Sequence, residues 1–269
     1  MSNTFSLLTS NCFGLWLPGT QQRLLALARE LEKSQHQVVC LQEIQLHRYR
    51  ELLVNASPSY PYAYSERYMH CPAGGLLTLS RIGLTDTSFI PYEERGLWYT
   101  PMLLDRLFYK GMLVTKLTWE NIPVTIINTH ILANFAGDWK RRGMYARVEE
   151  RQLEELAETV RAQSTDSFIV VVGDFNIPRG SVLYHDFMQS AGLTDPLAGD
   201  TRSTLRAPLG MRSSYTLAID YVLFRMPIRR KLKVACELCF VEKYPINESQ
   251  LGYLSDHYGI EMQITVDGI

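Results

Sequence analysis

The segment from residue 170 to 181, VVVGDFNIPRGS, places a carboxylate and an amide directly after an apolar run. Side chains alternate between the two faces of a strand, so Asp174 and Asn176 are expected to point the same way. Two oxygen ligands on one face suit a hard divalent cation. The same residue types also favour turns, so this segment alone fits both a metal site and a plain strand-to-turn junction.

Polar residues of similar kinds stand at the ends of several other apolar runs. These positions are Asn11, Glu43, His130, Asp174, Asn176, Asp220, Asp256 and His257. One such residue usually marks a cap or a turn, but so many in one chain are hard to assign to turns alone. Strand ends of a two-sheet sandwich can converge on one rim, so we expect these side chains to share a cleft.

The acidic members of this set predict a site for Mg²⁺ or Mn²⁺. Glu43 and Asp256 supply carboxylate oxygens, and the Asp174 and Asn176 pair supplies more. A divalent cation there would neutralise a phosphate group, polarise its P–O bonds and stabilise the leaving oxygen. The chemistry that fits these groups is hydrolysis of a phosphate ester.

The remaining members predict proton transfer and hydrogen bonding to phosphate. His257 titrates near neutrality and is the candidate base that takes a proton from water. Asp220 is expected to hold the other ring nitrogen of His257, which fixes its tautomer. His130, Asn11 and Asn176 are candidate donors to a pentavalent phosphate.

The elements that position these residues follow from hydrophobic periodicity and turn residues. Strands are predicted at 5–11, 38–43, 63–67, 74–80, 87–92, 111–119, 124–130, 168–174, 219–224, 232–241 and 258–266, and helices at 20–34, 139–161 and 180–192. No linker-like stretch divides the chain, so residues 1–269 are predicted to form one domain. Strands outnumber helices and several are joined as hairpins, which favours two mixed sheets packed face to face with helices outside.

Composition narrows the class of protein. The chain has 269 residues, a net charge of −1 and 46% hydrophobic residues, which is typical of a soluble globular protein and supplies no global attraction for a polyanion. No apolar run approaches the roughly 20 residues of a spanning helix, and the first residues do not resemble a signal peptide. Five cysteines fit a reducing compartment, so a cytoplasmic location is expected. The pair Cys236 and Cys239 is expected to be packed thiols rather than a zinc site.

The motifs NTH, GDFN, DYVLF and SDHYG, with an early strand-end Asn and LQE, resemble the endonuclease/exonuclease/phosphatase superfamily. The resemblance runs from Phe5 to about Val266, in the order of the family. It implies a four-layer α/β sandwich of the deoxyribonuclease I-like kind and a divalent-metal phosphoesterase. The implied metal residues are Glu43, Asn11, Asp174, Asn176 and Asp256. The implied catalytic residues are His257 with Asp220, together with His130, Asp174 and Asn176.

Within that superfamily the chain is most similar to the neutral sphingomyelinase-like branch. The segments that carry this likeness are SNCFGLW (10–16), GGLLTLSR (74–81), FYKG (108–111) and THILANFAGDW (129–139). The likeness implies Lys110 and Asn134 as substrate contacts, with Lys110 near the phosphate of a lipid. Leu132 departs from the branch, which tends to carry His or Gln at that position.

Three features of the sequence each allow two interpretations. Residues 96–111 are dense in aromatic residues and leucine and fit either core packing or an apolar lip that touches a lipid. Arg141, Arg142 and Arg147 fit a solvated helix face or a contact to phosphate. Arg179 is a candidate for the phosphate cleft or an ordinary loop residue.

Three functions follow from these observations. The favoured one is hydrolysis of a phosphodiester, with a phospholipid as the leading substrate. A nuclease or DNA-repair phosphodiesterase is the alternative, although the chain has no obvious basic stripe for a nucleic acid. A catalytically silent binding module is the third, and the complete set from Asn11 to His257 argues against it. The oligomeric state is not predicted.

Overall fold

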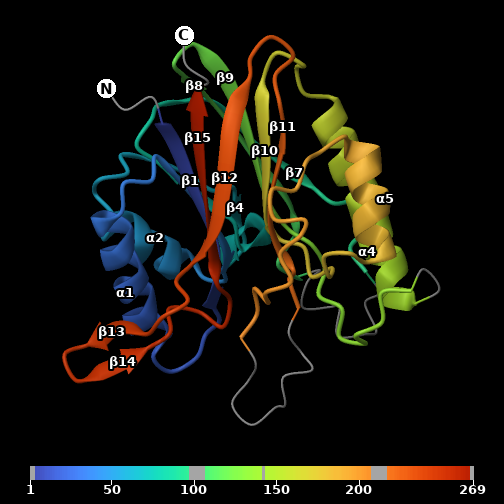
Figure 1. Cartoon of the computed structure of the whole chain (residues 1–269). Helices are drawn as coiled ribbons and strands as arrows, with labels where there is room; N and C mark the ends of the chain where they lie inside the picture. The colour runs from blue at the N-terminus through green and yellow to red at the C-terminus, as the bar shows by residue number, and fades with distance from the viewer. Residues whose placement is uncertain (1–3, 97–106, 141–142, 207–216, 267–269) are drawn as a thin grey trace.

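The computed structural model describes residues 4–96, 107–140, 143–206 and 217–266. Two mixed sheets make up its centre (Figure 1). The six-stranded sheet has the order β12 (Leu232–Cys239), β15 (Gly259–Val266), β1 (Thr4–Gly14), β2 (Val38–Ile44), β6 (Leu77–Ser80) and β3 (Tyr62–Tyr64). The five-stranded sheet has the order β11 (Asp220–Arg225), β10 (Phe168–Asp174), β9 (Ile122–His130), β8 (Gly111–Trp119) and β7 (Leu84–Pro91).

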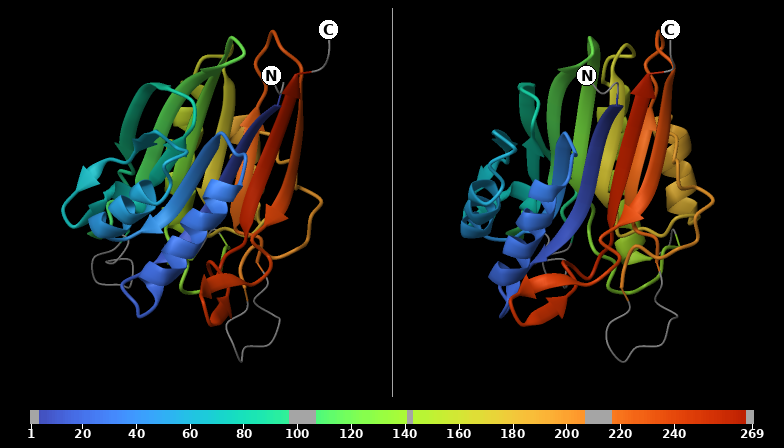
Figure 2. Two further views of the ribbon diagram at one scale, coloured as in Figure 1. Left: turned by 90° about the vertical axis from the view of Figure 1, so that its left-hand side faces the viewer. Right: turned by 60° about the vertical axis from the view of Figure 1, so that its left-hand side comes forward.

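Helices cover the outer faces of both sheets. Helices α1 (Thr20–Lys33) and α2 (His47–Asn55) lie on the six-stranded sheet, and α4 (Met144–Arg161) and α5 (Val182–Ala191) lie on the five-stranded sheet (Figure 2). A third apolar core fills the space between the sheets, where Leu7 and Val38 of one sheet belong to the same cluster as Ile126 and Val170 of the other. The predicted four-layer α/β sandwich is confirmed.

The register of the five-stranded sheet aligns three of the predicted site residues. Strand β10 pairs in parallel with β9 so that Asp174 faces His130, and it pairs antiparallel with β11 so that Asp174 faces Asp220. Gly173 permits this close pairing, because a Cβ atom there would lie 1.8 Å from the carbonyl oxygen of Thr129. Its φ of 136° is also one that side-chain-bearing residues rarely adopt. The three polar side chains therefore leave the sheet side by side.

A buried polar contact joins the two sheets behind these strand ends. Gln42 of β2 donates from Nε2 to Oδ1 of Asn128 on β9 at 2.7 Å, and Nδ2 of Asn128 donates to the carbonyl oxygen of Leu41 at 3.2 Å. Both amide side chains are fully buried. Because Glu43 follows Gln42 directly, this contact holds the end of β2, and with it Glu43, next to the end of β9.

Some element boundaries differ from the sequence-based prediction. The long helix begins at Met144 rather than at residue 139, because the indole of Trp139 is turned toward the site and donates to the carbonyl oxygen of Asn176. The strand predicted at 232–241 ends at Cys239, since Phe240 takes a φ of 56° that interrupts an extended chain. The strand predicted at 63–67 is split into β3 and β4 (Arg67–Tyr68), and β4 pairs with β5 (Cys71–Pro72).

Helix α2 and the hairpin of β13 (Tyr244–Asn247) and β14 (Gln250–Gly252) were not predicted. Helix α2 buries only Tyr49 and Leu53, so its apolar periodicity is too short to be distinctive. The hairpin is short and carries a polar turn, and it is held by Arg29 of α1, which donates to the carbonyl oxygens of Pro245 and Ile246. Its position thus depends on a contact with a distant helix.

Two further predictions concerned the Cys236 and Cys239 pair and membrane-spanning helices. Cys236 packs against the core between the sheets whereas Cys239 packs against the core under α1, so the two thiols point to opposite faces of β12. They therefore cannot bind one metal ion together, and all five cysteines are free. None of the helices in the described ranges is both long and apolar enough to cross a membrane.

Candidate active site

A cleft of about 400 Å³ opens where the strands of the two sheets end. Its polar lining consists of Glu43, Gln45, Lys110, His130, Asp174, Asn176, Asp256 and His257. Its apolar lining consists of Phe13, Leu15, Phe108, Ala133 and Phe135, together with Gly74 and Gly75. The strand-end residues expected to converge therefore do meet, with Asn11 and Asp220 buried directly behind the lining.

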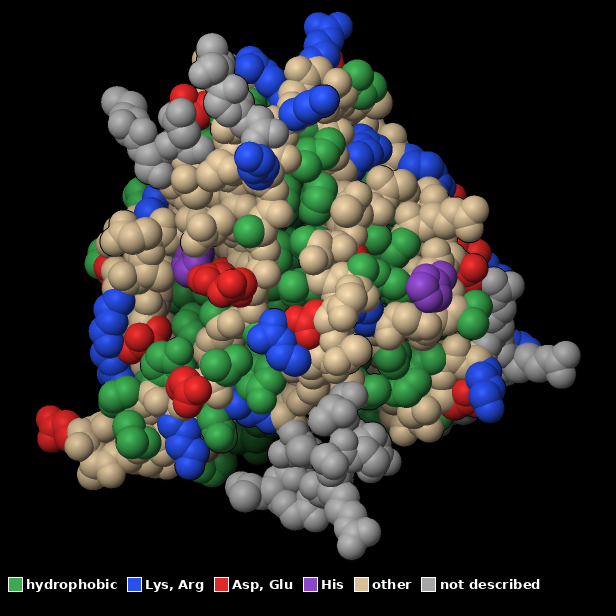
Figure 3. Space-filling model, in the orientation of Figure 1, with side chains coloured by type: hydrophobic (Ala, Val, Ile, Leu, Met, Phe, Trp, Pro, Cys, Tyr) green, Lys and Arg blue, Asp and Glu red, His purple; other side chains and the backbone are tan. Residues whose placement is uncertain are grey.

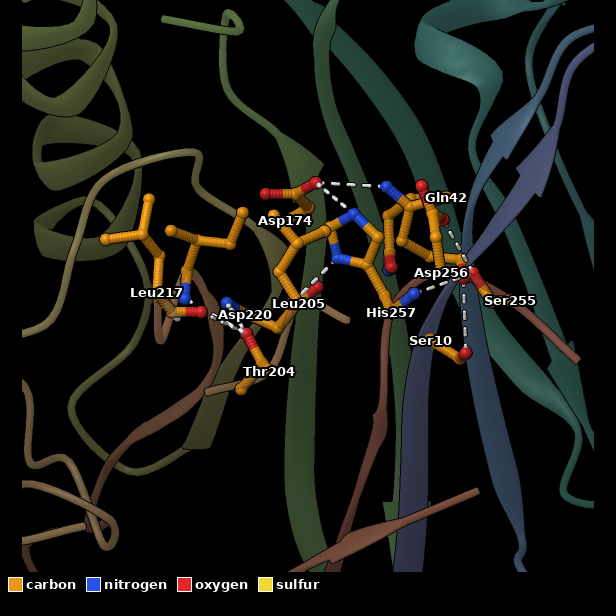
Figure 4. A network of polar contacts seen from close by, with 12 residues as sticks. Ser10, Gln42, Asp174, Thr204, Leu205, Leu217, Asp220, Ser255, Asp256 and His257 are labelled. Carbon is orange, nitrogen blue, oxygen red and sulfur yellow. Dashed lines mark hydrogen bonds and ion pairs between the residues drawn. The ribbon is translucent and has the colours of Figure 1, made fainter. Parts of the chain in front are cut away.

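His257 lies between two carboxylates. Its Nδ1 atom is 2.9 Å from Oδ2 of Asp220, and its Nε2 atom is 3.8 Å from Oδ2 of Asp174 (Figure 4). Burial by itself lowers the pKa of His257, but the negative charges of Asp220 and Asp174 outweigh it and raise the pKa well above its usual value. Asp220 therefore holds one ring nitrogen, and the other ring nitrogen faces the cleft.

Asp174 lies at the centre of the site and contacts Asn11, His130 and Asn176. Its Oδ2 atom accepts a hydrogen bond from Nδ2 of Asn11 at 2.9 Å and lies 3.7 Å from Nε2 of His130. Its Oδ1 atom accepts from the backbone N–H of Asn176 at 2.8 Å. Burial, with the nearby carboxylate of Asp220, raises the pKa of Asp174 to about 7. The charge of His257 acts in the opposite direction but does not outweigh this burial, so a further cation beside Asp174 would stabilise the charged carboxylate.

Glu43 adds a second acidic group to the same place. One ligand atom each from Glu43, His130 and Asp174 lies within 4.8 Å of the others. Burial raises the pKa of Glu43, although the charges of His257 and Lys110 and a hydrogen bond from Asn11 act in the opposite direction. Carboxylate oxygens this close together fit a hard divalent cation.

Two residues of this cluster have a strained backbone. Glu43 has a φ of 60° and Asn176 a φ of 54°, and both values lie in the left-handed region that disfavours residues with side chains. Such strain costs about 1–3 kcal/mol per residue and concentrates at functional sites. At Glu43 the strand ends with its carboxylate turned into the cleft.

Asn176, His130 and Lys110 add amide, imidazole and ammonium groups to the same cleft. Nδ2 of Asn176 lies 3.1 Å from Nε2 of His130 and donates to the carbonyl oxygen of Ile131 at 3.0 Å. Burial, with the charges of Lys110 and His257, keeps the pKa of His130 well below its usual value, so this imidazole is neutral. Lys110 is only 5% exposed and donates from Nζ to the carbonyl oxygen of Ile131 at 2.7 Å.

Other candidate residues lie outside the cleft lining. Asn134 donates from Nδ2 to Oε2 of Glu149 at 3.0 Å and is not among the lining residues. Arg179 is paired with Asp195 at 2.8 Å and is likewise not among them. Arg147 is exposed on α4. Arg141, Arg142 and most of the 96–111 segment (97–106) lie outside the described residues.

Phe13, Leu15 and Phe135 of the apolar wall were not predicted as part of the site, whereas Phe108 belongs to the 96–111 segment for which an apolar lip was one interpretation. Phe13 stands two residues after Asn11, and Phe135 stands five residues after His130. Their closeness to the polar motifs was the available signal, but an aromatic residue near a strand end is more often part of the core. The structure leaves Phe135 59% exposed at the mouth.

Comparison with known proteins agrees with this architecture. The sequence matches the Endonuclease/Exonuclease/phosphatase family over residues 8–264, which is nearly the whole chain. The chain belongs to this family. The four-layer sandwich is accordingly of the deoxyribonuclease I-like kind, and the phosphoesterase resemblance of the sequence motifs is confirmed at the level of the family.

One curated relative and two solved structures are similar to this chain. The inositol phosphosphingolipids phospholipase C of Saccharomyces cerevisiae is 26% identical over 171 residues, covering 61% of this chain but only 34% of the yeast protein. D. rerio TDP2 complexed with a single-stranded DNA product has a TM-score of 0.76 at 16% identity and covers 98% of this chain and 99% of its own. Beta toxin from Staphylococcus aureus with bound magnesium ions has a TM-score of 0.75 at 16% identity, covering 97% of this chain and 99% of its own. The two structures share the fold with this family member.

Proposed function

We propose that this protein is a divalent-metal-dependent phosphodiesterase that cleaves a phospholipid-type phosphodiester, as sphingomyelinases and phospholipases C do. The observation that carries the proposal is the meeting of a histidine–carboxylate pair with an acidic cluster in one cleft. Nε2 of His257 lies 3.8 Å from Oδ2 of Asp174, which belongs to the group with Glu43. Attack of water on a phosphodiester needs a proton acceptor and a cation at such close range.

His257 would accept the proton of the attacking water at Nε2. Its Nδ1 atom is engaged by Asp220 at 2.9 Å, so Asp220 orients the ring and stabilises the imidazolium that forms. Mg²⁺ or Mn²⁺, when held by Glu43 and Asp174 with Asn176 and Asp256, would polarise the P–O bonds and stabilise the leaving oxygen.

Neutral donors would bind the phosphate oxygens. His130 and Asn176 lie side by side at the cleft, with 3.1 Å between Nε2 and Nδ2. Burial lowers the pKa of His130, and a neutral imidazole carries one N–H donor and one acceptor nitrogen, so His130 would offer a single hydrogen bond to a phosphate oxygen. Donors arranged in advance around a developing negative charge stabilise it without reorganisation.

The surroundings of these groups favour a lipid over a nucleic acid. Lys110 is the one lysine or arginine among the described lining residues, and five of the other lining side chains are apolar. Binding along a nucleic acid backbone requires several cationic groups. On the face shown in Figure 3, lysine and arginine side chains are scattered among acidic and uncharged groups. The yeast relative, by its name, acts on inositol phosphosphingolipids, which supports the same class of substrate.

A panel of substrates tests the proposal. Phosphosphingolipid and glycerophospholipid in mixed micelles, a soluble aryl phosphodiester, single-stranded DNA and abasic duplex DNA are assayed with Mg²⁺, Mn²⁺ and Ca²⁺. We expect a lipid phosphodiester to be cleaved at least tenfold faster, per enzyme, than either DNA.

His257→Ala is the control for contaminating activity, and it should lose about 10²–10⁴-fold in rate while remaining folded. A tenfold preference for DNA would assign the cleft to a nuclease instead. Absence of hydrolysis of every substrate by folded, metal-supplemented protein would favour the catalytically silent binding module.

A further inference from the structure

Thr204 lies in an irregular segment between the start of β11 and the residues that precede β15. It is fully buried, and it belongs to no helix or strand. The segment runs beside residues 217–220 on one side and residues 256–258 on the other (Figure 4). These two stretches carry Asp220, which begins β11 of the five-stranded sheet, and His257, which precedes β15 of the six-stranded sheet.

The hydroxyl of Thr204 holds the start of β11. Its Oγ1 atom accepts hydrogen bonds from the backbone N–H groups of Ile219 at 3.0 Å and Asp220 at 3.1 Å. Buried N–H groups without a partner are costly, so one oxygen satisfies two donors at the point where the strand begins. Because threonine is β-branched, its χ1 angle is restricted and the hydroxyl keeps its direction.

The backbone of the same segment holds the stretch that carries His257. The carbonyl oxygen of Thr204 accepts from the N–H of Tyr258 at 2.7 Å, and the N–H of Arg206 donates to the carbonyl oxygen of Asp256 at 2.7 Å. Leu205 and His257 form an antiparallel bridge between these two contacts. Thr204 therefore contacts the backbone N–H of Asp220 directly. It is linked to His257 through the hydrogen bond to Tyr258 and through the neighbouring Leu205.

We propose that Thr204 is a positioning residue that sets the contact between Asp220 and His257. It does not line the cleft, so it touches neither substrate nor cation and acts through Asp220. The contact it sets is the 2.9 Å distance between Nδ1 of His257 and Oδ2 of Asp220, two residues that are 37 positions apart in sequence. This inference rests on the proposed function, because the contact between His257 and Asp220 has a catalytic role only if the protein carries out that hydrolysis.

The test is Thr204→Val, which keeps the shape and removes the hydroxyl, compared with Thr204→Ser, which keeps the hydroxyl. Displacement of a catalytic group by about 1 Å can cost roughly 100-fold, so we expect Thr204→Val to lower kcat by about 10- to 100-fold. KM and the Mg²⁺ concentration at half-maximal rate should stay within about threefold of wild type, since ground-state contacts are untouched. Thr204→Ser should stay within about threefold in kcat.

Thr125→Val is the matched control. Thr125 is also buried and its Oγ1 lies 3.0 Å from Oγ of Ser167, but it stands near the start of β9, remote from the cleft. It should lose stability without a change in rate per folded molecule. A loss of rate equal to that of Thr204→Val would assign both effects to general destabilisation and overturn the proposal.

A double-mutant cycle with Asp220→Asn separates positioning from structural support. If Thr204 acts through Asp220, adding Thr204→Val to Asp220→Asn should change kcat by less than about threefold, because the interaction is already lost. Full additivity of the two losses in rate would overturn the inference.

A crystal structure of Thr204→Val gives a readout that does not depend on activity. We expect the distance from Nδ1 of His257 to Oδ2 of Asp220 to exceed about 3.5 Å, beyond a normal hydrogen bond. An unchanged distance would refute the role of Thr204 even if the enzyme hydrolysed none of the tested phosphodiesters, an outcome that would by itself refute only the proposed function.

Discussion

Asn11 donates from Nδ2 to Oδ2 of Asp174 at 2.9 Å, and this hydrogen bond connects the six-stranded sheet to the five-stranded sheet at the candidate active site. Both side chains are buried. The oxygen that accepts it is the one that lies closest to Nε2 of His130 and Nε2 of His257. The position of the central carboxylate thus depends on how the two sheets pack.

Asn11→Leu should impair both stability and catalysis. Loss of a hydrogen bond to a buried carboxylate costs about 1–3 kcal/mol, and Asp174 would be left free to move within the site. We expect kcat/KM per folded molecule to fall at least tenfold, measured beside denaturant unfolding. Asn128→Leu is the comparison, because it removes another buried amide between the sheets without touching Asp174. An equal loss of rate in both variants would show that sheet packing, and not the Asn11 contact, is what matters.

Glu43→Gln should weaken the cation site. It removes the charge and keeps the shape, so we expect the Mg²⁺ or Mn²⁺ concentration at half-maximal rate to rise at least tenfold. Chelation with EDTA should abolish activity of the wild type, and added Mg²⁺ or Mn²⁺ should restore it. Calorimetric titration with the metal alone provides a second measurement. Glu51→Gln, on the exposed surface of α2, should leave the titration unchanged. Full activity after exhaustive chelation would exclude a role for a dissociable metal.

Asp220→Asn should change the pH dependence of hydrolysis. A base is active when deprotonated, so the rate rises with pH through the pKa of His257 and then levels. Asp220 raises this pKa, and removal of its charge should therefore move the acid limb of kcat/KM to lower pH. The plateau should also fall, though by less than in His257→Ala, because water can partly replace the orienting bond. His185→Gln, an exposed position on α5, is the control. An unchanged acid limb would show that Asp220 does not raise the pKa of this base.

Glu149→Gln should stabilise the protein at alkaline pH. Glu149 is fully buried on α4, its Oε1 atom has no hydrogen-bond partner within the part of the chain that the structure describes, and burial raises its pKa to about 8. The unfolded chain has a pKa of about 4.3 at this residue, so the folded state binds more protons between these values and stability falls as pH rises through them. The neutral amide avoids this loss.

We therefore expect the melting temperature of Glu149→Gln to exceed that of wild type by on the order of 10 °C at pH 8, at roughly 2–4 °C per kcal/mol, with little difference at pH 4. Glu158→Gln, exposed on the same helix, should show no such pH dependence. A constant difference between Glu149→Gln and wild type across pH would contradict the raised pKa as its cause.

The sequence by itself determined which residues stand at strand ends and, from this, the kind of chemistry. Alternation along the strands predicted that His130 and Asp174 would emerge at the ends of apolar runs, and the parallel pairing of β9 with β10 places them side by side. These features are local, because periodicity and turn residues act over a few neighbouring positions. The same local signals predicted the strands of both sheets and three of the helices.

The tertiary structure alone decided how the two sheets meet. The contact of Asn11 with Asp174, the two hydrogen bonds to Thr204 and the turn of Trp139 toward Asn176 each join residues far apart in the sequence. No local pattern encodes such contacts, because they depend on the register and packing of elements that are distant in the sequence. The apolar wall with Phe13 and Phe135 is likewise a product of packing, since the same aromatic residues in another arrangement would be part of the core.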